Sequence, residues 1–513
     1  MNNTNRVITN SIFLYLRIII TTLISLSTVP IVMHALGNRD YGLYMLIGGT
    51  ITLLSFLKSS MTVSTQRFLS VAVGKNSLTQ INKIYNNSII IHYIFGICVA
   101  LVLEAAYPFL FNGFLKIDLD RLDSAKLIYH FLVISVFFDI TSVPYIGVIN
   151  AKENMLIFSL AGILEGLLKL LLAISLTSFF IDKLIVYGAG LLIITFIIRC
   201  FYFIYVKIAY KELNMDLHKY MDKSTLLQII GFTGWNTMGA LALVGRNEGI
   251  AVILNRFFDL IENAAYGVAN QINGVMGYVS QTFQKSTNPQ LMKSYGMNDL
   301  KRLVRLSYIS SKFSTLLFAF FSIPLIIEME YILKIWLKTP APSTVIMSQL
   351  ILILSLIYQF SMGLMSAIQA TGNIRNYQIT ISLLILLNVP ITYLLFKIGL
   401  PAYSCGYCFI SIELISLTYR IFMAKKIAGI SLKDFVKDVL LPTLLCIICT
   451  TSFALWIHFA IDESLFRLIS VIFLSMIVFS VCLWTFGLKG SEKDILLNFV
   501  KNIRVGIFKY KLW

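Results

Sequence analysis

Residues 383–395 read LLILLNVPITYLL, a stretch without a single charged side chain. A helix that crosses a bilayer needs about 20 consecutive, mostly apolar residues, so this stretch and its neighbours can form one crossing. Residues 350–360 form a second run of this kind. The strands of a membrane β-barrel would alternate polar and apolar side chains and would interrupt such runs. The pattern therefore favours transmembrane helices.

The composition extends this pattern to the whole chain of 513 residues. Hydrophobic residues make up 58% of it and charged residues only 13%, whereas soluble domains carry about 25% charged residues. This apolar content can supply on the order of a dozen or more spans. We therefore expect an all-α polytopic membrane protein and exclude a soluble globule.

Polar and Gly/Pro-rich punctuation divides the chain into fourteen predicted transmembrane spans. They are placed at residues 8–36, 41–64, 88–111, 125–149, 155–180, 184–206, 226–254, 262–284, 307–332, 344–369, 377–397, 400–423, 439–461 and 466–488. No small-residue cleavage site follows the first apolar run, so we expect it to be a retained span and not a signal peptide.

The charge distribution gives the expected orientation. The chain has 42 Lys and Arg against 25 Asp and Glu, a net charge of +17. If the N-terminus is cytoplasmic, most basic residues outside the spans fall in inner segments, as the positive-inside rule requires. We therefore expect both termini on the cytoplasmic side. Topology accounts for the basic balance, so no nucleic-acid partner is predicted.

An internal repeat links the two halves of the chain. Residues 35–42 after the first span correspond to residues 260–267 after the seventh, an offset of 225. The segment from Leu69 to Ile81 corresponds to Leu291 to Leu303, an offset of 222, and residues 150–154 correspond to 369–373. Because six predicted spans separate the copies, both halves have the same orientation, as in transporters built from parallel repeats.

The repeat predicts the domain organisation. We expect an N-lobe at 1–206, a cytoplasmic inter-lobe loop at 207–225 and a C-lobe at 226–423. Two additional spans at 424–488 and a basic cytoplasmic tail at 489–513 follow.

Two motifs carry a family resemblance. The first is Ala35-Leu36-Gly37, followed by Tyr41-Gly42-Leu43-Tyr44, and the second runs from Gly234-Trp235 through Asn263 to Gln271 and Pro289-Gln290-Leu291. These residues resemble the polysaccharide flippases of the multidrug/oligosaccharidyl-lipid/polysaccharide exporter (MOP) superfamily, and most of all the bacterial O-antigen flippases, often called Wzx-type.

The resemblance implies a MATE-like fold and a transport function. Two six-helix lobes would enclose a cavity that opens alternately to either side and moves an undecaprenyl-pyrophosphate-linked oligosaccharide, the O-antigen repeat unit, across the bacterial inner membrane. It also implies partners in polysaccharide assembly, such as a polymerase.

Ionisable residues inside the predicted spans are the candidates for the transport path. A charged side chain facing lipid at the centre of a span costs roughly 2.5 to 3.5 kcal/mol on insertion scales, so most must face a cavity, a partner or an interface. They are Arg17, Lys58, Lys169, Arg199, Arg246, Glu104, Asp139, Glu165, Glu248 and Glu413.

The five cations are predicted to bind the anionic headgroup, because guanidinium groups bind phosphate in a forked geometry. Arg17 and Arg246 lie deep in the first and seventh spans, which correspond to each other in the repeat. Snorkelling to the inner surface is the alternative interpretation for Lys58 and Arg199. Lys169 follows Glu165 at i,i+4, which also favours a local ion pair.

The eighth predicted span is unusually polar. It holds Asn263, Asn270, Gln271, Asn273 and Gln281 together with three glycines. Asn270 and Gln271 are predicted to contact sugar hydroxyls in a hydrated path; the alternative is close helix packing with amide cross-bonds. Asp139, Glu165 and Glu248 are candidate coupling-ion sites, although interface hydrogen bonds would also account for buried carboxylates.

Other functional classes find less support in the sequence. A drug or organic-cation antiporter of the same superfamily is the alternative, but a cationic substrate would favour an acid in the first span, which has Arg17 instead. A membrane sugar polymerase or ligase would need a large outer loop or a cluster of catalytic acids. No P-loop, G-x-S-x-G or H-E-x-x-H motif is present, and the Cys-x-x-Cys pairs lie in apolar runs. We therefore predict no enzyme activity, cofactor or metal.

Overall fold

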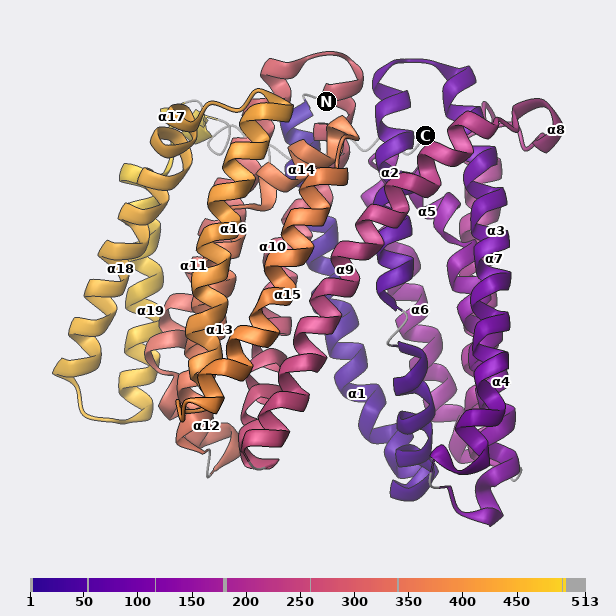
Figure 1. Ribbon diagram of the computed structural model, residues 1–513, viewed down its shortest axis with the longest axis horizontal. Helices are drawn as coiled ribbons and strands as arrows, with labels where there is room; N and C mark the ends of the chain where they lie inside the picture. The colour runs from indigo at the N-terminus through magenta and orange to yellow at the C-terminus, as the bar shows by residue number, and fades with distance from the viewer. Residues whose placement is uncertain are drawn as a thin grey trace. The chain divides into compact units, whose positions relative to one another are not determined.

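The computed structural model describes residues 3–52, 55–115, 117–178, 182–258, 260–338, 341–490 and 492–494. Within these ranges every regular element is a helix and no strand occurs (Figure 1). The structure thus confirms the predicted all-α class. Most of the predicted basic tail at 489–513 lies outside the described residues.

The chain divides into two compact units. The N-unit comprises Asn10–Leu241 together with Met292–Asn298, and the C-unit comprises Met1–Thr9, Ala242–Leu291 and Asp299–Trp513. The lobe boundaries predicted from the sequence stay predictions.

The N-unit is built mainly from the first eight helices and the beginning of the ninth. They are α1 (Asn3–Thr52), α2 (Ser55–Gly74), α3 (Leu78–Phe109), α4 (Leu122–Thr141), α5 (Val143–Ala151), α6 (Met155–Ser175), α7 (Lys183–Ala209), α8 (Leu217–Tyr220) and α9 (Lys223–Phe257), with the short π-helix η1 (Leu110–Phe114) and the 3₁₀-helices η2 (Leu119–Arg121) and η3 (Leu176–Ser178). Figure 1 shows α3, α4 and α7 side by side; α4 packs against both of the others.

The C-unit contains the rest of α9 and all later helices, except that the last turns of α10 belong to the N-unit. They are α10 (Leu260–Gly296), α11 (Leu300–Ile327), α12 (Met329–Leu337), α13 (Pro342–Gln359), α14 (Met362–Thr371), α15 (Arg375–Lys397), α16 (Ser404–Ala428), α17 (Leu432–Phe435), η4 (Val436–Leu440), α18 (Leu441–Ala460), α19 (Leu465–Cys482) and η5 (Leu483–Gly487). The helices α18 and α19 form a hairpin that packs on α11 (Figure 1).

Eleven helices in the described ranges are long and apolar enough to cross a membrane, and a twelfth span results if the bent pair α13–α14 is counted as one crossing. The two predicted spans that fail this test are 41–64 and 262–284. Residues 41–52 of the first continue α1 beyond the non-helical Gly37 (φ 77°, ψ 164°), and residues 55–64 lie in α2, which is rich in Ser and Thr and carries Lys58. The second lies in α10, which carries the row of amides. Their polarity indicates that these two helices have limited contact with lipid.

The backbone supports the internal repeat. Asn76 after α2 and Asn298 after α10 both adopt a left-handed conformation, with φ of 53° and 59°. Asparagine tolerates this region better than most residues do, so the same turn is made from the same residue type. The fourth and tenth predicted spans are also interrupted at corresponding places, between α4 and α5 at Ser142 and between α13 and α14 near Ser361.

Candidate substrate-binding site

Arg17 on α1 lies against α6 in the N-unit. Its guanidinium carbon is 4.3 Å from the centre of the Phe158 ring, a distance at which a cation is attracted by the π face. Among the described residues, no carboxylate oxygen lies within 4 Å of its guanidinium nitrogens. The half-buried charge of Arg17 is therefore not neutralised by a direct ion pair.

The two lysines of this region are paired locally. Lys58 Nζ on α2 donates to Asp139 Oδ1 on α4 at 2.7 Å. Lys58 is therefore held by a carboxylate within the N-unit. Lys169 Nζ donates to Glu165 Oε1 at 2.6 Å, which confirms the local i,i+4 pair that their spacing favours.

These five side chains form one electrostatic cluster, although they come from α1, α2, α4 and α6. The charges of Arg17 and Lys58 both act on Glu165, and the charge of Asp139 acts on Lys169. Two of the three cations have a carboxylate partner of their own. The positive charge that remains belongs to Arg17.

Arg199 on α7 is held by polar and aromatic groups. Its Nε donates to Thr141 Oγ1 at 3.0 Å, and one terminal nitrogen donates to the hydroxyl of Tyr93. The guanidinium also lies near the Phe138 ring, 5.8 Å from its centre. Arg199 is thus hydrogen-bonded within the N-unit, and like Arg17 it has no carboxylate within 4 Å among the described residues.

Arg246 on α9 is the corresponding cation of the C-unit. Its Nε and one terminal nitrogen donate to Asn247 Oδ1 at 3.2 and 3.0 Å, and its guanidinium carbon lies 5.2 Å from the centre of the Phe409 ring. Within the described part of the chain no carboxylate oxygen lies within 4 Å of it. Glu248, two residues farther on, is exposed and does not neutralise Arg246.

A buried ion pair in α16 escaped the sequence analysis. Arg420, with a side chain only 1% exposed, donates to Glu413 and, at 3.1 Å, to Ser361 Oγ. The signal was present as opposite charges seven residues apart, which is two helical turns, in an otherwise apolar span. Glu413 is also close enough to feel the charge of Arg246. Because Arg420 occupies Glu413, that carboxylate does not pair directly with Arg246.

The amides of α10 fit both interpretations made from the sequence. Asn273 Oδ1 accepts from Ser355 Oγ on α13 at 2.5 Å, a cross-bond of the packing kind. Asn270 Nδ2 donates back to Tyr266 O in its own helix at 3.0 Å. Gln271 and Gln281, in contrast, are exposed. The exposed amides remain available to hydrogen-bonding groups outside the C-unit.

The other candidate carboxylates have partners. Glu104 Oε1 lies 2.9 Å from His130 Nδ1, and Asp139 and Glu165 hold lysines, as described above. The described residues contain no group of three His, Cys, Asp or Glu side chains arranged to hold a metal. The structure thus contains interface ion pairs and hydrogen bonds at positions where the sequence left a coupling role open.

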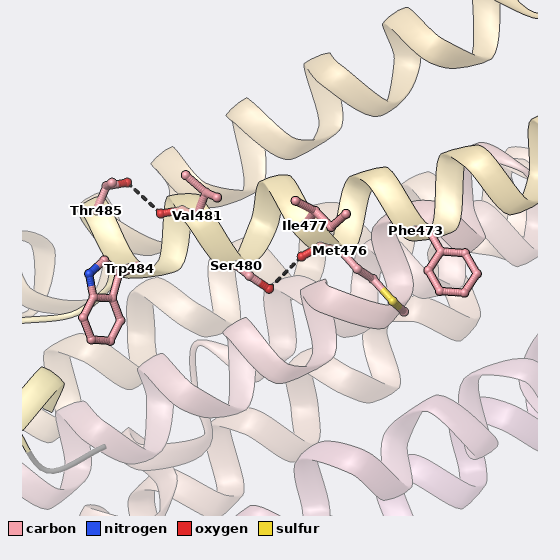
Figure 2. A pocket seen from close by; sticks show the side chains of 7 residues that line it. All are labelled: Phe473, Met476, Ile477, Ser480, Val481, Trp484 and Thr485. Carbon is pink, nitrogen blue, oxygen red and sulfur yellow. Dashed lines mark hydrogen bonds between the residues drawn. The ribbon is translucent and has the colours of Figure 1, made fainter. Parts of the chain in front are cut away.

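A pocket of about 520 Å³ lies on the outer face of α19 and η5, away from all these charges (Figure 2). Its lining is almost entirely apolar and includes Phe473, Ile477 and Trp484. Its two hydroxyls are bonded to their own helix, Ser480 to Met476 O and Thr485 to Val481 O (Figure 2). This surface suits a lipid acyl chain, and the nearest cation that the structure places at it is Lys493, whose Nζ lies 5.6 Å from the centre of the Trp484 ring.

Comparisons with known proteins bear on the fold. No protein-family model and no curated protein matches the sequence. Solved structures do match: a MATE crystal structure in complex with MaD3S has a TM-score of 0.72 at 12% identity, with 84% of this chain and 98% of that chain covered. An outward-facing multidrug resistance MATE family transporter of the MOP superfamily has a TM-score of 0.71 at 12% identity, with 84% and 96% covered.

A third similar structure is a MOP superfamily transporter from Pyrococcus furiosus, described as having a binding pocket of reversed polarity that suggests a different function. Its TM-score is 0.72 at 13% identity, with 84% of this chain and 96% of that chain covered. The chain therefore has the fold of MATE transporters of the MOP superfamily.

Proposed function

We propose that this protein is a flippase that moves an undecaprenyl-pyrophosphate-linked oligosaccharide, the O-antigen repeat unit, from the inner to the outer leaflet of the bacterial inner membrane. The observation that carries this proposal is the unequal pairing of the charges. Lys58, Lys169 and Arg420 each have a carboxylate, whereas Arg17 and Arg246 have none within 4 Å among the described residues. Each unit thus contributes at least one uncompensated guanidinium.

The chemistry of the cargo matches this arrangement. A pyrophosphate diester carries about two negative charges, which lose hydration on entering a path of low dielectric constant. A guanidinium whose charge is not already neutralised offsets that loss and binds phosphate oxygens through two parallel N–H groups. The exposed Gln271, with Asn270 beside it, would supply amide hydrogen bonds to sugar hydroxyls.

Transport would follow alternating access, with Arg17 of the N-unit and Arg246 of the C-unit each serving as a cation for the headgroup. The uncharged undecaprenyl chain would stay in the bilayer, and the inner-membrane location and the partnership with a polysaccharide polymerase belong to the same proposal. An organic-cation antiporter would instead need an unpaired acid. In the N-unit Asp139 and Glu165 are occupied by lysines, and the exposed Glu248 of the C-unit is the acid that this alternative would use.

The decisive experiment uses the purified chain in liposomes that contain undecaprenyl pyrophosphate bearing a fluorescent sugar, with leaflet exposure measured by dithionite quenching. Losing charge-assisted hydrogen bonds weakens binding by roughly 10- to 100-fold, so we expect Arg17→Ala and Arg246→Ala to slow flipping at low lipid content by about that factor. Arg17→Lys keeps the charge without the fork and should fall between.

Lys425→Ala is the matched control, because it removes an exposed cation at the end of α16. Normal flipping in both arginine variants, or transport of ethidium with no flipping of the lipid by the wild type, would overturn the proposed function. In cells, deletion of the gene should leave the lipid-linked sugar on the inner leaflet. Expressing flippases of other serotypes in the deletion strain would show which of them restore transport, and so would define cargo selectivity.

A further inference from the structure

Gly162 of α6 lies directly beneath the guanidinium of Arg17. A Cβ atom built on Gly162 would be 2.1 Å from Arg17 Nε and 2.6 Å from its Cζ. Contacts this short do not occur between real atoms, so any side chain at position 162 and the present guanidinium position exclude each other. The head group of Arg17 therefore depends on a residue without a side chain at this position.

Two groups of α6 lie against the guanidinium of Arg17, the backbone at Gly162 and the Phe158 ring. Phe158 lies one helical turn before Gly162, and its ring is 4.3 Å from the guanidinium carbon. We call the bare backbone at Gly162 together with this ring the Arg17 seat. A planar guanidinium that lies on such a seat is oriented by shape and by the cation–π attraction.

The same face of α6 also determines the electrostatic surroundings of Arg17. Phe158, Gly162, Glu165 and Lys169 follow one another at spacings of three or four residues, so they share one face of the helix. Glu165 acts electrostatically on Arg17, but its carboxylate is held by Lys169 at 2.6 Å. Lys169 thereby competes with Arg17 for the nearest acid on α6.

We propose that Gly162 is a positioning residue for headgroup recognition: the Arg17 seat holds the guanidinium where its N–H groups stay available to a phosphate oxygen of a lipid-linked pyrophosphate. Lys169 supports the same arrangement by keeping Glu165 occupied. This inference rests on the proposed function and adds to it the residues that orient Arg17.

The position allows a selective test. The atoms that a Cβ at 162 would meet belong to the far end of a flexible side chain, so Gly162→Ala can displace the guanidinium while the helices stay in place. Gly166, one turn farther along α6, gives the matched control. The three atoms nearest to a Cβ there belong to Ile24 of α1, at ordinary distances of 3.5 Å or more.

The experiment measures binding of two probes to the purified full-length chain in nanodiscs: undecaprenyl pyrophosphate, and undecaprenol, which has the same chain without phosphate. We expect Gly162→Ala to weaken binding of undecaprenyl pyrophosphate roughly tenfold, as loss of a charged hydrogen bond does, and to leave undecaprenol binding unchanged. Gly166→Ala should leave both unchanged. In an Arg17→Ala background, Gly162→Ala should add no further loss, because the two act as one unit.

A second arm addresses Lys169. Lys169→Met frees Glu165 to pair with Arg17 and should also weaken binding of undecaprenyl pyrophosphate. The double variant Glu165→Gln/Lys169→Met removes the competing acid and should restore the affinity. If Lys169 merely stabilised the fold, the double variant would bind no better than the single one, and the supporting role of Lys169 would be overturned.

The possible failures are distinguishable. Equal wild-type affinity for the two probes would overturn the proposed function, and this inference with it. Loss of pyrophosphate binding in Arg17→Ala without a loss in Gly162→Ala would overturn the inference alone. An equal loss for both probes in Gly162→Ala would show a structural role and would also overturn it.

Discussion

Gly74 at the end of α2 and Gly296 at the end of α10 occupy equivalent positions in the two copies of the repeat. Gly74 packs against the backbone of α10, and Gly296 packs against the backbone of α2. A Cβ on Gly74 would lie 2.3 Å from Lys293 O, and a Cβ on Gly296 would lie 2.2 Å from Val71 O. Position 71 corresponds to 293 as 74 corresponds to 296, so the contact has an approximate twofold symmetry. The ends of α2 and α10 thus meet in the N-unit at a distance that only glycine permits.

This contact predicts a strong size limit at both positions. Because the opposing atoms are backbone and cannot turn aside, we expect Gly74→Ala and Gly296→Ala to lower the free energy of unfolding by about 1 to 3 kcal/mol each. Fluorescence-detected size exclusion after heating would measure the loss. Gly231→Ala on α9 is the control, since its Cβ would meet no atom within 4 Å. Wild-type thermal behaviour of both variants would contradict the close backbone contact.

How well the sequence predicts a feature of this structure depends on how far apart in the chain the interacting residues lie. Helices follow from apolar runs, and the Lys169–Glu165 pair follows from i,i+4 spacing, because both are local in the chain. The pairing of Lys58 with Asp139 joins residues 81 positions apart and depends on the tertiary arrangement that brings these two side chains of α2 and α4 together. The Arg17 seat was equally invisible, because glycine in a membrane helix is too common to indicate which side chain covers it.

The buried Glu413–Arg420 pair should be costly to break from one side. Both side chains are more than 90% buried, and removal of one partner of a buried pair typically costs about 3 to 5 kcal/mol. We expect Glu413→Leu and Arg420→Leu each to reduce thermal stability sharply and the double variant to recover much of it. A double variant that is as unstable as the sum of the singles would contradict a coupled pair.

Three asparagines of α3 should hold the inter-lobe loop on the N-unit. Each amide donates to one loop carbonyl and accepts from the N–H two residues farther along. The pairs are Asn82 with Glu212 O and Asn214 N, Asn86 with Asn214 O and Asp216 N, and Asn87 with Tyr220 O and Asp222 N. We expect Asn86→Ala, which removes two of these bonds, to speed tryptic cleavage at Lys219 roughly tenfold.

Asn376→Ala on the exposed face of α15 is the matched substitution for this measurement, and it should leave cleavage unchanged. Because the purified protein in detergent exposes both membrane faces, topology does not limit the protease. Equal cleavage rates in Asn86→Ala and the wild type would show that the loop is held by other contacts.

The end of this loop should be sensitive to acid. Asp222 accepts hydrogen bonds from the hydroxyl and the N–H of Thr225, which lower its pKa below the ordinary value of 3.8. A carboxyl with a lowered folded pKa stabilises the fold fully above its ordinary pKa, and the contribution is lost as the pH falls through the lower folded value. Amide-exchange protection at the start of α9 should therefore drop below about pH 4 in the wild type. Asp222→Asn, which does not titrate, should show a smaller change across the same range.

The segment after η5 should stabilise the C-unit through one carboxylate. Lys312 of α11, only 2% exposed, donates to Glu492 Oε2 at 2.7 Å, and Lys489 pairs with Asp438 at 2.6 Å beside it. Glu492→Ala would leave a buried ammonium without a partner, so we expect a loss of about 3 to 5 kcal/mol. The heated fraction that remains monodisperse would report this loss.

Lys312→Met separates charge neutralisation from simple packing. If Glu492 acts by neutralising Lys312, the double variant Lys312→Met/Glu492→Ala should be more stable than Glu492→Ala alone, because no buried charge remains. Asp494→Ala removes an exposed acid two residues away and should be silent. If Glu492→Ala is as stable as Asp494→Ala, the ammonium of Lys312 does not need the carboxylate of Glu492. If the double variant is no more stable than Glu492→Ala alone, the segment stabilises the C-unit by packing and not by neutralising Lys312.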